Sequence, residues 1–329
     1  MINIKYSNIY LKYLNIYIIF FLISFESYFY QKYNFCNECV NKKLKDIECT
    51  QCPLEIIFKG LRIHSKEKTL REIIVYNKSI SRFGDGEYRI MYGENTIFQK
   101  YDKNLSQRLL EVLKSNEKNL LIGISIPYRK KDLDERSESS KNFWYRYFTS
   151  NKLKIARLIN KKRIYYSSMI SRFYSVYKDK TKCSEYIKTL KKIWDKRDIL
   201  IIEGEKTRVG IGNDLLNNSN SIKRIICPTY HAFSVYEKII SAVKNFDKNI
   251  LILIALGQTA TVLAFDLYKL NYQVIDIGHF DIEYELYLRK AKTIMKIPYK
   301  FVLEAGGTKN ISNISDINYY NQIAYKILN

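Results

Sequence analysis

Short, uninterrupted apolar runs recur along the chain and are separated by polar segments. They lie at 119–128 (NLLIGISIPY), 198–204 (DILIIEG), 249–257 (NILILIALG) and 272–279 (YQVIDIGH), and further runs open the segments 79–87 and 221–233. Such runs are typical of β-strands. Because they are continuous and do not alternate with polar residues, they indicate strands covered on both faces. The pattern therefore predicts a mostly parallel sheet.

Amphipathic segments alternate with these strands. In NLSQRLLEVLKS (104–115), apolar residues recur at Leu105, Leu109, Val112 and Leu113, which is the spacing of one helix face. Strands that alternate with helices predict an α/β domain over residues 60–329. Polar groups follow several of the strands, at the sheet edge where open α/β folds bind ligands.

The first of these polar groups is RFGDGE at 82–87. Gly84 and Gly86 flank Asp85, and Glu87 follows, so we expect a sharp turn that presents two carboxylates. An Asp-x-Glu pair on such a turn could hold a divalent metal. An ordinary turn is the alternative.

Two glycine-containing segments are candidates for binding a phosphate. EGEKTRVGIGNDLL (203–216) matches neither the Walker loop nor the dinucleotide fingerprint, but its backbone N–H groups could face a phosphate. The alternative is that Asn213 or Asp214 caps a short helix. In GQTATVLAFDLYKL (257–270), Gly257 and Thr259 open a helix whose first amides suit a diphosphate, and a plain capped helix is the alternative.

The segment DIGHFDIEYE (276–285) concentrates acidic residues around a histidine. If it is helical, Asp281 and Glu285 pair at i, i+4; if it is extended, Asp281, Glu283 and Glu285 share a face. In both cases Asp281 and Glu285 face one site, where a carboxylate could take a proton from an attacking hydroxyl. An acidic surface helix is the alternative.

Two arginines lie among aromatic residues. Arg172 is in MISRFYSVY (169–177), and Arg146 is near Trp144 in ERSESSKNFWYRYF (135–148). Arginine can pair with phosphate, and aromatic rings can stack on a base or a sugar. Amphipathic core helices are the alternative for both segments.

Residues 1–59 differ from the rest and are expected to form an N-terminal extension. Its apolar segment 10–30 has about the length of a spanning helix, but includes Lys12, Asn15 and Glu26. No small-residue cleavage site follows, which disfavours a signal peptide. A short membrane anchor, an interfacial helix and a helix packed on the main domain stay open.

Four of the six cysteines form two C-x-x-C pairs within 36–52: Cys36, Cys39, Cys49 and Cys52. Such pairs are candidate ligands of a structural Zn²⁺, although the gap between them is shorter than usual. Two local disulfides or four free thiols are the alternatives.

The amino-acid composition limits the classes of protein to which this chain can belong. The chain has 329 residues, of which 47 % are hydrophobic, so it can bury a large core and wholesale disorder is excluded. Its formal net charge of +22 favours contact with polyanions such as nucleic acid, anionic lipid or phosphorylated ligands. No nucleic-acid-binding motif is recognisable, and we expect no specific nucleic-acid partner.

Several motifs occur together in a fixed order: RFGDGE, SRFY, the EG…TR.G.GNDL block, RIICP…AF, ALGQTATVLAFDL and IDIGHFDIEYE. In this order they resemble the GT-D-type glycosyltransferases, the domain also known as DUF1792. The resemblance runs from about residue 70 to 307. Gln258 stands where the family usually has proline, and Leu286 stands where a tryptophan is common.

The resemblance implies a Rossmann-like domain of the GT-D type that transfers a hexose, typically glucose, from a UDP-sugar with Mn²⁺ or Mg²⁺. The acceptor would be a glycan or a lipid- or protein-linked glycoconjugate of a bacterial surface polysaccharide or glycoprotein. The family's Asp-x-Glu motif matches Asp85 and Glu87, and its His and Glu match His279 and Glu285. The first 60 residues have no counterpart.

We therefore expect Asp85 and Glu87 to hold the metal and Glu285 to act as general base, with Glu283 as the second candidate. His279 and Asp281 would orient the base or the sugar. The expected UDP-sugar ligands are Arg82, Gly84, Gly86, Arg208, Asn213, Asp214, Gly257 and Thr259.

Two other functions stay open. One is a basic, zinc-containing nucleic-acid-binding or scaffold protein without catalysis, and the other is a metal-dependent nucleotide hydrolase. The expected location is the cytoplasm, with peripheral attachment to the anionic inner face of the membrane.

Overall fold

The computed structural model describes residues 54–307 and 311–328. They fall into two compact units. The smaller contains helix α3 (Leu54–Ile57) and the part of helix α8 (Glu138–Leu158) from Trp144 to Arg157. In it the ring of Phe148 packs on those of Phe58 and Trp144, with centroids 6.0 and 5.5 Å away. The predicted extension 1–59 stays a prediction, because its apolar segment and its four cysteines lie outside the described residues.

The larger unit contains a nine-stranded sheet in the described part of the chain, and every strand pairing in it is parallel. The strands are β1 (Arg62–Ile63), β2 (Ser79–Phe83), β3 (Leu120–Ile124), β4 (Ile164–Ser167), β5 (Asp198–Gly204), β6 (Ser221–Cys227), β7 (Leu251–Ala255), β8 (Gln273–Asp276) and β9 (Ile323–Lys326). Their order across the sheet is β1-β4-β3-β2-β8-β7-β5-β6-β9. The predicted parallel α/β fold is confirmed.

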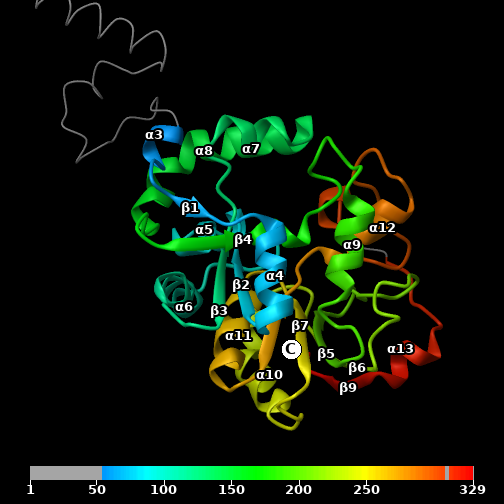
Figure 1. Cartoon of the computed structure of the whole chain (residues 1–329). Coiled ribbons are helices and arrows are strands. Elements are labelled where there is room, and N and C mark those ends of the chain that lie inside the picture. Colours follow the sequence, from blue (N-terminus) through cyan, green and yellow to red (C-terminus); the bar gives the residue numbers. More distant parts are fainter. Residues whose placement is uncertain (1–53, 308–310, 329) are drawn as a thin grey trace, which may run out of the picture. The chain divides into compact units, whose positions relative to one another are not determined.

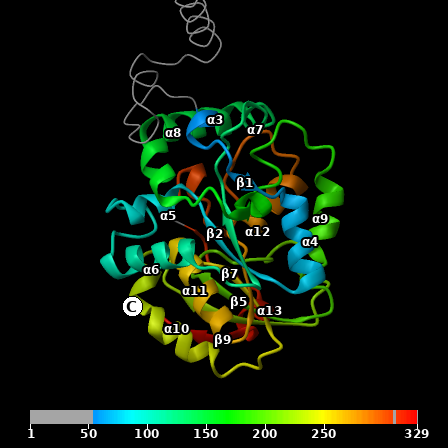
Figure 2. The ribbon, with the colours of Figure 1, turned by 60° about the vertical axis from the view of Figure 1, so that its left-hand side comes forward.

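Helices cover both faces of the sheet (Figures 1 and 2). Along β5, Ile199 and Ile201 join the core on one face, and Leu200 and Ile202 join the core on the other. The first face is covered by α4 (Lys66–Tyr76), α9 (Cys183–Lys191) and α12 (Phe280–Leu288), and the second by α10 (Tyr236–Val243) and α11 (Gln258–Lys269). Helix α6 (Lys103–Lys114) packs beside α11. This two-sided burial explains why the strands read as continuous apolar runs.

Shorter helices connect these elements. They are α5 (Asp85–Met91), α7 (Lys130–Asp134), α13 (Ile317–Asn321) and the 3-10 helices η1 (Ser168–Ser171), η2 (Ala232–Val235) and η3 (Leu303–Ala305). None of the helices within 54–307 and 311–328 combines the length and the apolar character that a bilayer span requires.

Four neighbouring strands carry the predicted site residues at their carboxyl ends. The segments after β2, β8, β7 and β5 begin at residues 84, 277, 256 and 205, and these strands are adjacent in the sheet. One edge of the sheet therefore collects groups that lie almost 200 residues apart in the sequence.

Three local predictions were wrong. Residues 84–87 form no turn: Gly84 has φ −124°, and Asp85 begins α5. The alternative of a short helix capped by Asn213 or Asp214 is wrong, because residues 213–218 form bends and turns. The segment 169–177 is irregular after η1, so it is no amphipathic helix.

Candidate active site

Asp85 and Glu87 lie in the first turn of α5, at the carboxyl end of β2. The Asp85 side chain is 39 % exposed, and its carboxylate is 4.0 Å from Nε of Arg89. Glu87 Oε2 accepts a hydrogen bond from the backbone N–H of Gly84 at 2.6 Å. Burial raises the pKa of both carboxyls, to about 7 for Glu87, and each contact only partly offsets it.

The donor set fits a hard divalent cation. Within the described ranges, no three His, Cys, Asp or Glu side chains gather in the geometry of a metal site. Mg²⁺, however, is commonly held by one or two carboxylates that leave further positions to substrate phosphates and water. Asp85 and Glu87 are carboxylates of this type in the first turn of α5.

Gly86 lies in close contact with α11 and forms no turn. A Cβ added to Gly86 would lie 2.2 Å from Nε2 of Gln258, the first residue of α11. The Gln258 amide in turn accepts a hydrogen bond from the Thr96 hydroxyl at 3.2 Å. The missing side chain thus lets α5, α11 and the loop 93–101 meet.

A charged cluster lies beside the two carboxylates. Arg172 donates a hydrogen bond to Glu304, whose Oε1 is 3.4 Å from Nε2 of His279. Burial alone would raise the pKa of Glu304, but His279 and Arg172 outweigh it and hold that pKa well below its usual value. The charges of Arg172 and Glu304 also act on the carboxyl of Asp85. We call Asp85, Arg172, His279 and Glu304 the edge cluster.

The edge cluster is open to solvent. The side chains of His279 and Glu304 are 36 and 32 % exposed. Glu283, by contrast, is fully buried and accepts hydrogen bonds from the backbone N–H groups of Tyr174 and Ser175 at 2.7 and 2.8 Å. Glu283 therefore anchors the segment after η1, and its carboxylate does not reach the surface.

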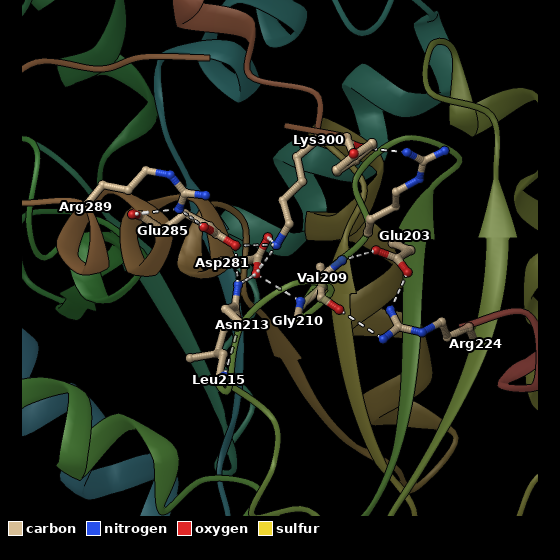
Figure 3. A network of polar contacts seen from close by, with 12 residues as sticks. Glu203, Val209, Gly210, Asn213, Leu215, Arg224, Asp281, Glu285, Arg289 and Lys300 are labelled. Carbon is tan, nitrogen blue, oxygen red and sulfur yellow. Dashed lines mark hydrogen bonds and ion pairs between the residues drawn. The ribbon is translucent and has the colours of Figure 1, made fainter. Parts of the chain in front are cut away.

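Asp281 and Glu285 face one buried site, as the helical spacing predicts (Figure 3). The Asn213 side-chain amide donates to both carboxylates, at 2.9 and 2.6 Å. Nζ of Lys300 lies 2.7 Å from Asp281 and 3.1 Å from Glu285. The alternative of an acidic surface helix is wrong, because both carboxylates are buried.

This environment affects the predicted general base. Burial alone would raise the pKa of Glu285, but Lys300, Asn213 and Arg289 outweigh it and lower that pKa. A carboxylate stabilised by two cations is a weak base, and Glu285 has almost no exposed surface. Its role as base stays a prediction, and its contacts favour a positioning role.

Arg82 joins the two central strands. Its Nη2 is 2.6 Å from Asp276 Oδ1, its Nε donates to the Asp276 carbonyl, and its Nη1 donates to Ser171 Oγ. Gly278 leaves room for this side chain, since an added Cβ would lie 1.9 Å from Nη2 of Arg82. These contacts hold the guanidinium inside the protein, so they favour a structural role over nucleotide binding.

The loop 205–220 is held by buried charges (Figure 3). Arg224 and Glu203 form an ion pair at 2.6 Å, and both also contact the backbone of Val209. Arg208 donates to the carbonyls of Tyr299 and Ser312 at 2.7 and 2.8 Å. The predicted ligand Arg208 thus ties the loop to the C-terminal segment.

The remaining predicted ligands are spread along the same edge. Asp214 pairs with Lys191 at 2.8 Å and accepts from the Tyr284 hydroxyl, so it binds α9 to α12. Gly257 has φ +54° and an exposed backbone, whereas Thr259 is buried. Of this pair, Gly257 is the residue that a ligand can approach.

Sequence reasoning missed Lys300, Arg289 and Glu304. All three lie beyond the last residue of α12, in a stretch with no motif or strand pattern. The partners of Lys300 and Glu304 are 15 to 132 residues away, so only the fold shows that these two complete the carboxylate clusters. Arg289 is at i, i+4 from Glu285, and a helical spacing could have shown that pair.

The parallel sheet, with polar groups gathered at the carboxyl ends of its strands, belongs to the open α/β class, in which ligands bind at that edge. Comparison with known proteins narrows this class. The model of the GT-D-fold glycosyltransferases matches residues 80–305. The chain therefore belongs to the GT-D glycosyltransferase family.

Two curated relatives support the same family assignment. The chain is 34 % identical over 288 residues to Glycosyltransferase GlyD of Streptococcus pneumoniae, covering 88 % of this chain and 35 % of the relative. It is 37 % identical over 268 residues to the probable glycosyl transferase Gly of Streptococcus gordonii, covering 80 and 38 %. The chain thus spans about a third of the length of the curated relatives it matches.

Two solved structures share the fold. One is described as a domain of unknown function 1792 with a distinct glycosyltransferase fold. Its TM-score is 0.79 and its sequence identity 32 %, and the match covers 84 % of this chain and 98 % of that one. The other is a new glycosyltransferase (DUF1792) from Streptococcus sanguinis, at 0.77 and 34 %, covering 81 and 99 %.

Proposed function

We propose that this chain transfers a hexose, glucose foremost, from a UDP-sugar to a hydroxyl of a glycan or of a lipid- or protein-linked glycoconjugate. The observation that carries the proposal is that Asp85 and Glu87 follow β2 and His279 follows the adjacent strand β8, so that they share one edge of the sheet, in a chain of the GT-D family. The donor, the metal and the acceptor are parts of this proposal.

In this reaction Asp85 and Glu87 would hold Mn²⁺ or Mg²⁺ against the diphosphate. When bound, such an ion neutralises charge that develops on the leaving diphosphate. The edge cluster would bind the sugar and the acceptor beside it, with the Arg172 guanidinium held in position by Glu304 and Glu283.

Of the four predicted catalytic residues, His279 has the exposed side chain, whereas Asp281, Glu283 and Glu285 are buried. His279 would therefore take the proton of the acceptor hydroxyl while its oxygen bonds to the anomeric carbon and the bond from that carbon to the diphosphate breaks. Glu304, on its Nε2 side, would stabilise the imidazolium that forms.

A UDP-release assay tests the proposal. The full chain is incubated with Mn²⁺, UDP-glucose or another UDP-hexose, and a panel of mono- and disaccharide acceptors. We expect acceptor-dependent UDP release that Asp85→Ala and Glu87→Gln each lower at least about 100-fold. Glu237→Gln, on the exposed face of α10, serves as the matched control and should leave the rate unchanged.

Two results would count against it. Equally fast UDP-sugar breakdown with and without acceptor would indicate a nucleotide hydrolase. Tight, salt-sensitive nucleic-acid binding without any turnover of UDP-hexoses would indicate the non-catalytic alternative.

A further inference from the structure

Three aromatic rings from separate loops pack against one another at the carboxyl edge of the sheet. Phe98 stacks on Tyr230 with centroids 6.3 Å apart and meets Phe301 at 5.7 Å. Tyr230 and Phe301 are 6.0 Å apart in an edge-to-face arrangement. Tyr230 is 43 % exposed. We call Phe98, Tyr230 and Phe301 the aromatic trio.

Hydrogen bonds fix the loops of Phe98 and Tyr230 to each other and fix Phe301 to the loop after β5. The His231 N–H donates to the Phe98 carbonyl at 2.7 Å, and the Lys100 N–H donates to Nδ1 of His231 at 3.1 Å. The Phe301 N–H donates to the Lys206 carbonyl at 3.0 Å. A flat ligand would therefore find the rings already in place, which lowers the entropy cost of binding.

A short path of contacts joins the trio to the two carboxylates of α5. Gly86, between Asp85 and Glu87, packs on Gln258. The neighbouring Gly257 faces Phe98, since a Cβ there would lie 3.5 Å from Cβ of Phe98. Because Gly257 has no side chain and an exposed backbone, no side chain at that position separates the carboxylates from the trio.

The strand order places Tyr230 of the trio away from His279. Tyr230 follows β6, whereas His279 follows β8, and three strand spacings separate β8 from β6, or about 14 Å. An acceptor hydroxyl has to lie near His279. The part of the donor beyond the diphosphate would point away from that group, and Tyr230, which follows a strand three positions away, is separated from it in this way.

We propose that the aromatic trio is the stacking surface for the nucleobase of the donor, with the exposed face of Tyr230 as its main contact. The inference rests on the proposed function and specifies where the same site binds uracil. Aromatic faces stack on the π-face of a base and tolerate any base, so the surface itself would select a nucleotide over an inorganic phosphate.

Titration calorimetry with Mn²⁺ and the full chain tests this proposal. Two ligands are compared: UDP, and inorganic pyrophosphate, which has no base. Tyr230→Ala and Tyr230→Leu should weaken UDP binding by about 5- to 150-fold, the range found when a stacking residue is removed. Tyr230→Phe, which keeps the ring, should bind UDP like the wild type, and none of the variants should alter pyrophosphate binding.

Tyr76→Ala is the matched control, because Tyr76 is 55 % exposed and ends α4 at the opposite edge of the sheet. Tyr230→Leu keeps apolar volume in the trio, so it serves if the alanine variant does not fold. UDP binding like the wild type in both the alanine and leucine variants would overturn the proposal, and so would an equal loss of pyrophosphate binding.

Three other outcomes have separate meanings. A raised KM for the acceptor with unchanged UDP binding would assign the trio to the acceptor and overturn the nucleobase assignment. If the wild type binds pyrophosphate with Mn²⁺ but gains nothing from the uridine of UDP, the trio proposal fails while the metal pair stands. If it binds neither ligand, the proposed function itself fails.

Discussion

Nη2 of Arg82 and Oδ1 of Asp276 lie 2.6 Å apart and join β2 to β8, the two strands from which the candidate active site extends. Both side chains are largely buried, and Arg82 also holds η1 through Ser171. In the sheet, β3 and β4 lie on the β2 side of this pair, and β7, β5 and β6 lie on its β8 side. The pair therefore fixes the relative position of Asp85 and His279.

Asp276→Asn should destabilise the fold by about 3 kcal/mol, because it leaves the Arg82 guanidinium buried without its carboxylate partner. Urea unfolding at pH 7 measures this change. Asp134→Asn, which removes an exposed ion pair with Lys141 at 3.6 Å, is the control and should change the free energy of unfolding by less than about 0.5 kcal/mol. Equal effects of the two variants would contradict this account of the central pair.

Lys300→Met should be among the most destabilising single substitutions, at about 4 kcal/mol. It would leave Asp281 without its cation and Glu285 with Arg289 alone, although both carboxylates stay buried. Lys296→Met, four residues earlier and exposed, is the matched control. Thermal and urea unfolding of both variants measure the change in stability. A Lys300→Met protein as stable as the control would contradict a stabilising role for the contacts of Lys300 with Asp281 and Glu285 in Figure 3.

The pKa of Glu285 links stability to pH. Its folded-state pKa is lowered below the ordinary 4.5, so its ionised form contributes stability at neutral pH that is lost as the pH falls below about 4.5. Glu285→Gln should be less stable than the wild type at pH 7 and should lose less stability between pH 5 and pH 3. Unfolding curves across this range measure the slope, with Glu237→Gln as the control that should run parallel to the wild type. A steeper loss of stability with falling pH in Glu285→Gln than in the wild type would show that folding does not lower the pKa of Glu285.

Gly86→Ala tests the contact between α5 and α11. The new Cβ would meet the Gln258 amide, so we expect a loss of about 1–2 kcal/mol by overpacking. In a Gln258→Ala background the same change should become neutral or stabilising, because alanine favours the helix over glycine. A double-mutant cycle measures the coupling. Additive effects in the cycle would mean that Gln258 is not the obstacle.

The sheet was predictable from the sequence because burial on both faces leaves a continuous apolar run, as in Ile199–Ile202. The pairing of Asp281 with Glu285 was predictable for a similar reason, since a helical period alone places both on one side of α12. In such elements a local repeat determines which way each side chain points.

The glycine segment shows where local reasoning fails. Two glycines around Asp85 suggest a turn, yet Gly84 is extended and Gly86 is helical, and the need for Gly86 comes from Gln258, 172 residues later. Lys300 and Glu304 were unpredictable for the same reason, because their significance depends on partners that only the tertiary fold brings near.

The central claim is that Asp85 and Glu87 bind a nucleoside diphosphate through a divalent metal. The most direct measurement is a calorimetric titration of UDP into the full chain with and without Mn²⁺, for the wild type, Asp85→Ala and Glu237→Gln. We predict metal-dependent UDP binding that is kept in Glu237→Gln and lost in Asp85→Ala. UDP binding of equal strength in Asp85→Ala, or binding indifferent to Mn²⁺, would contradict the claim.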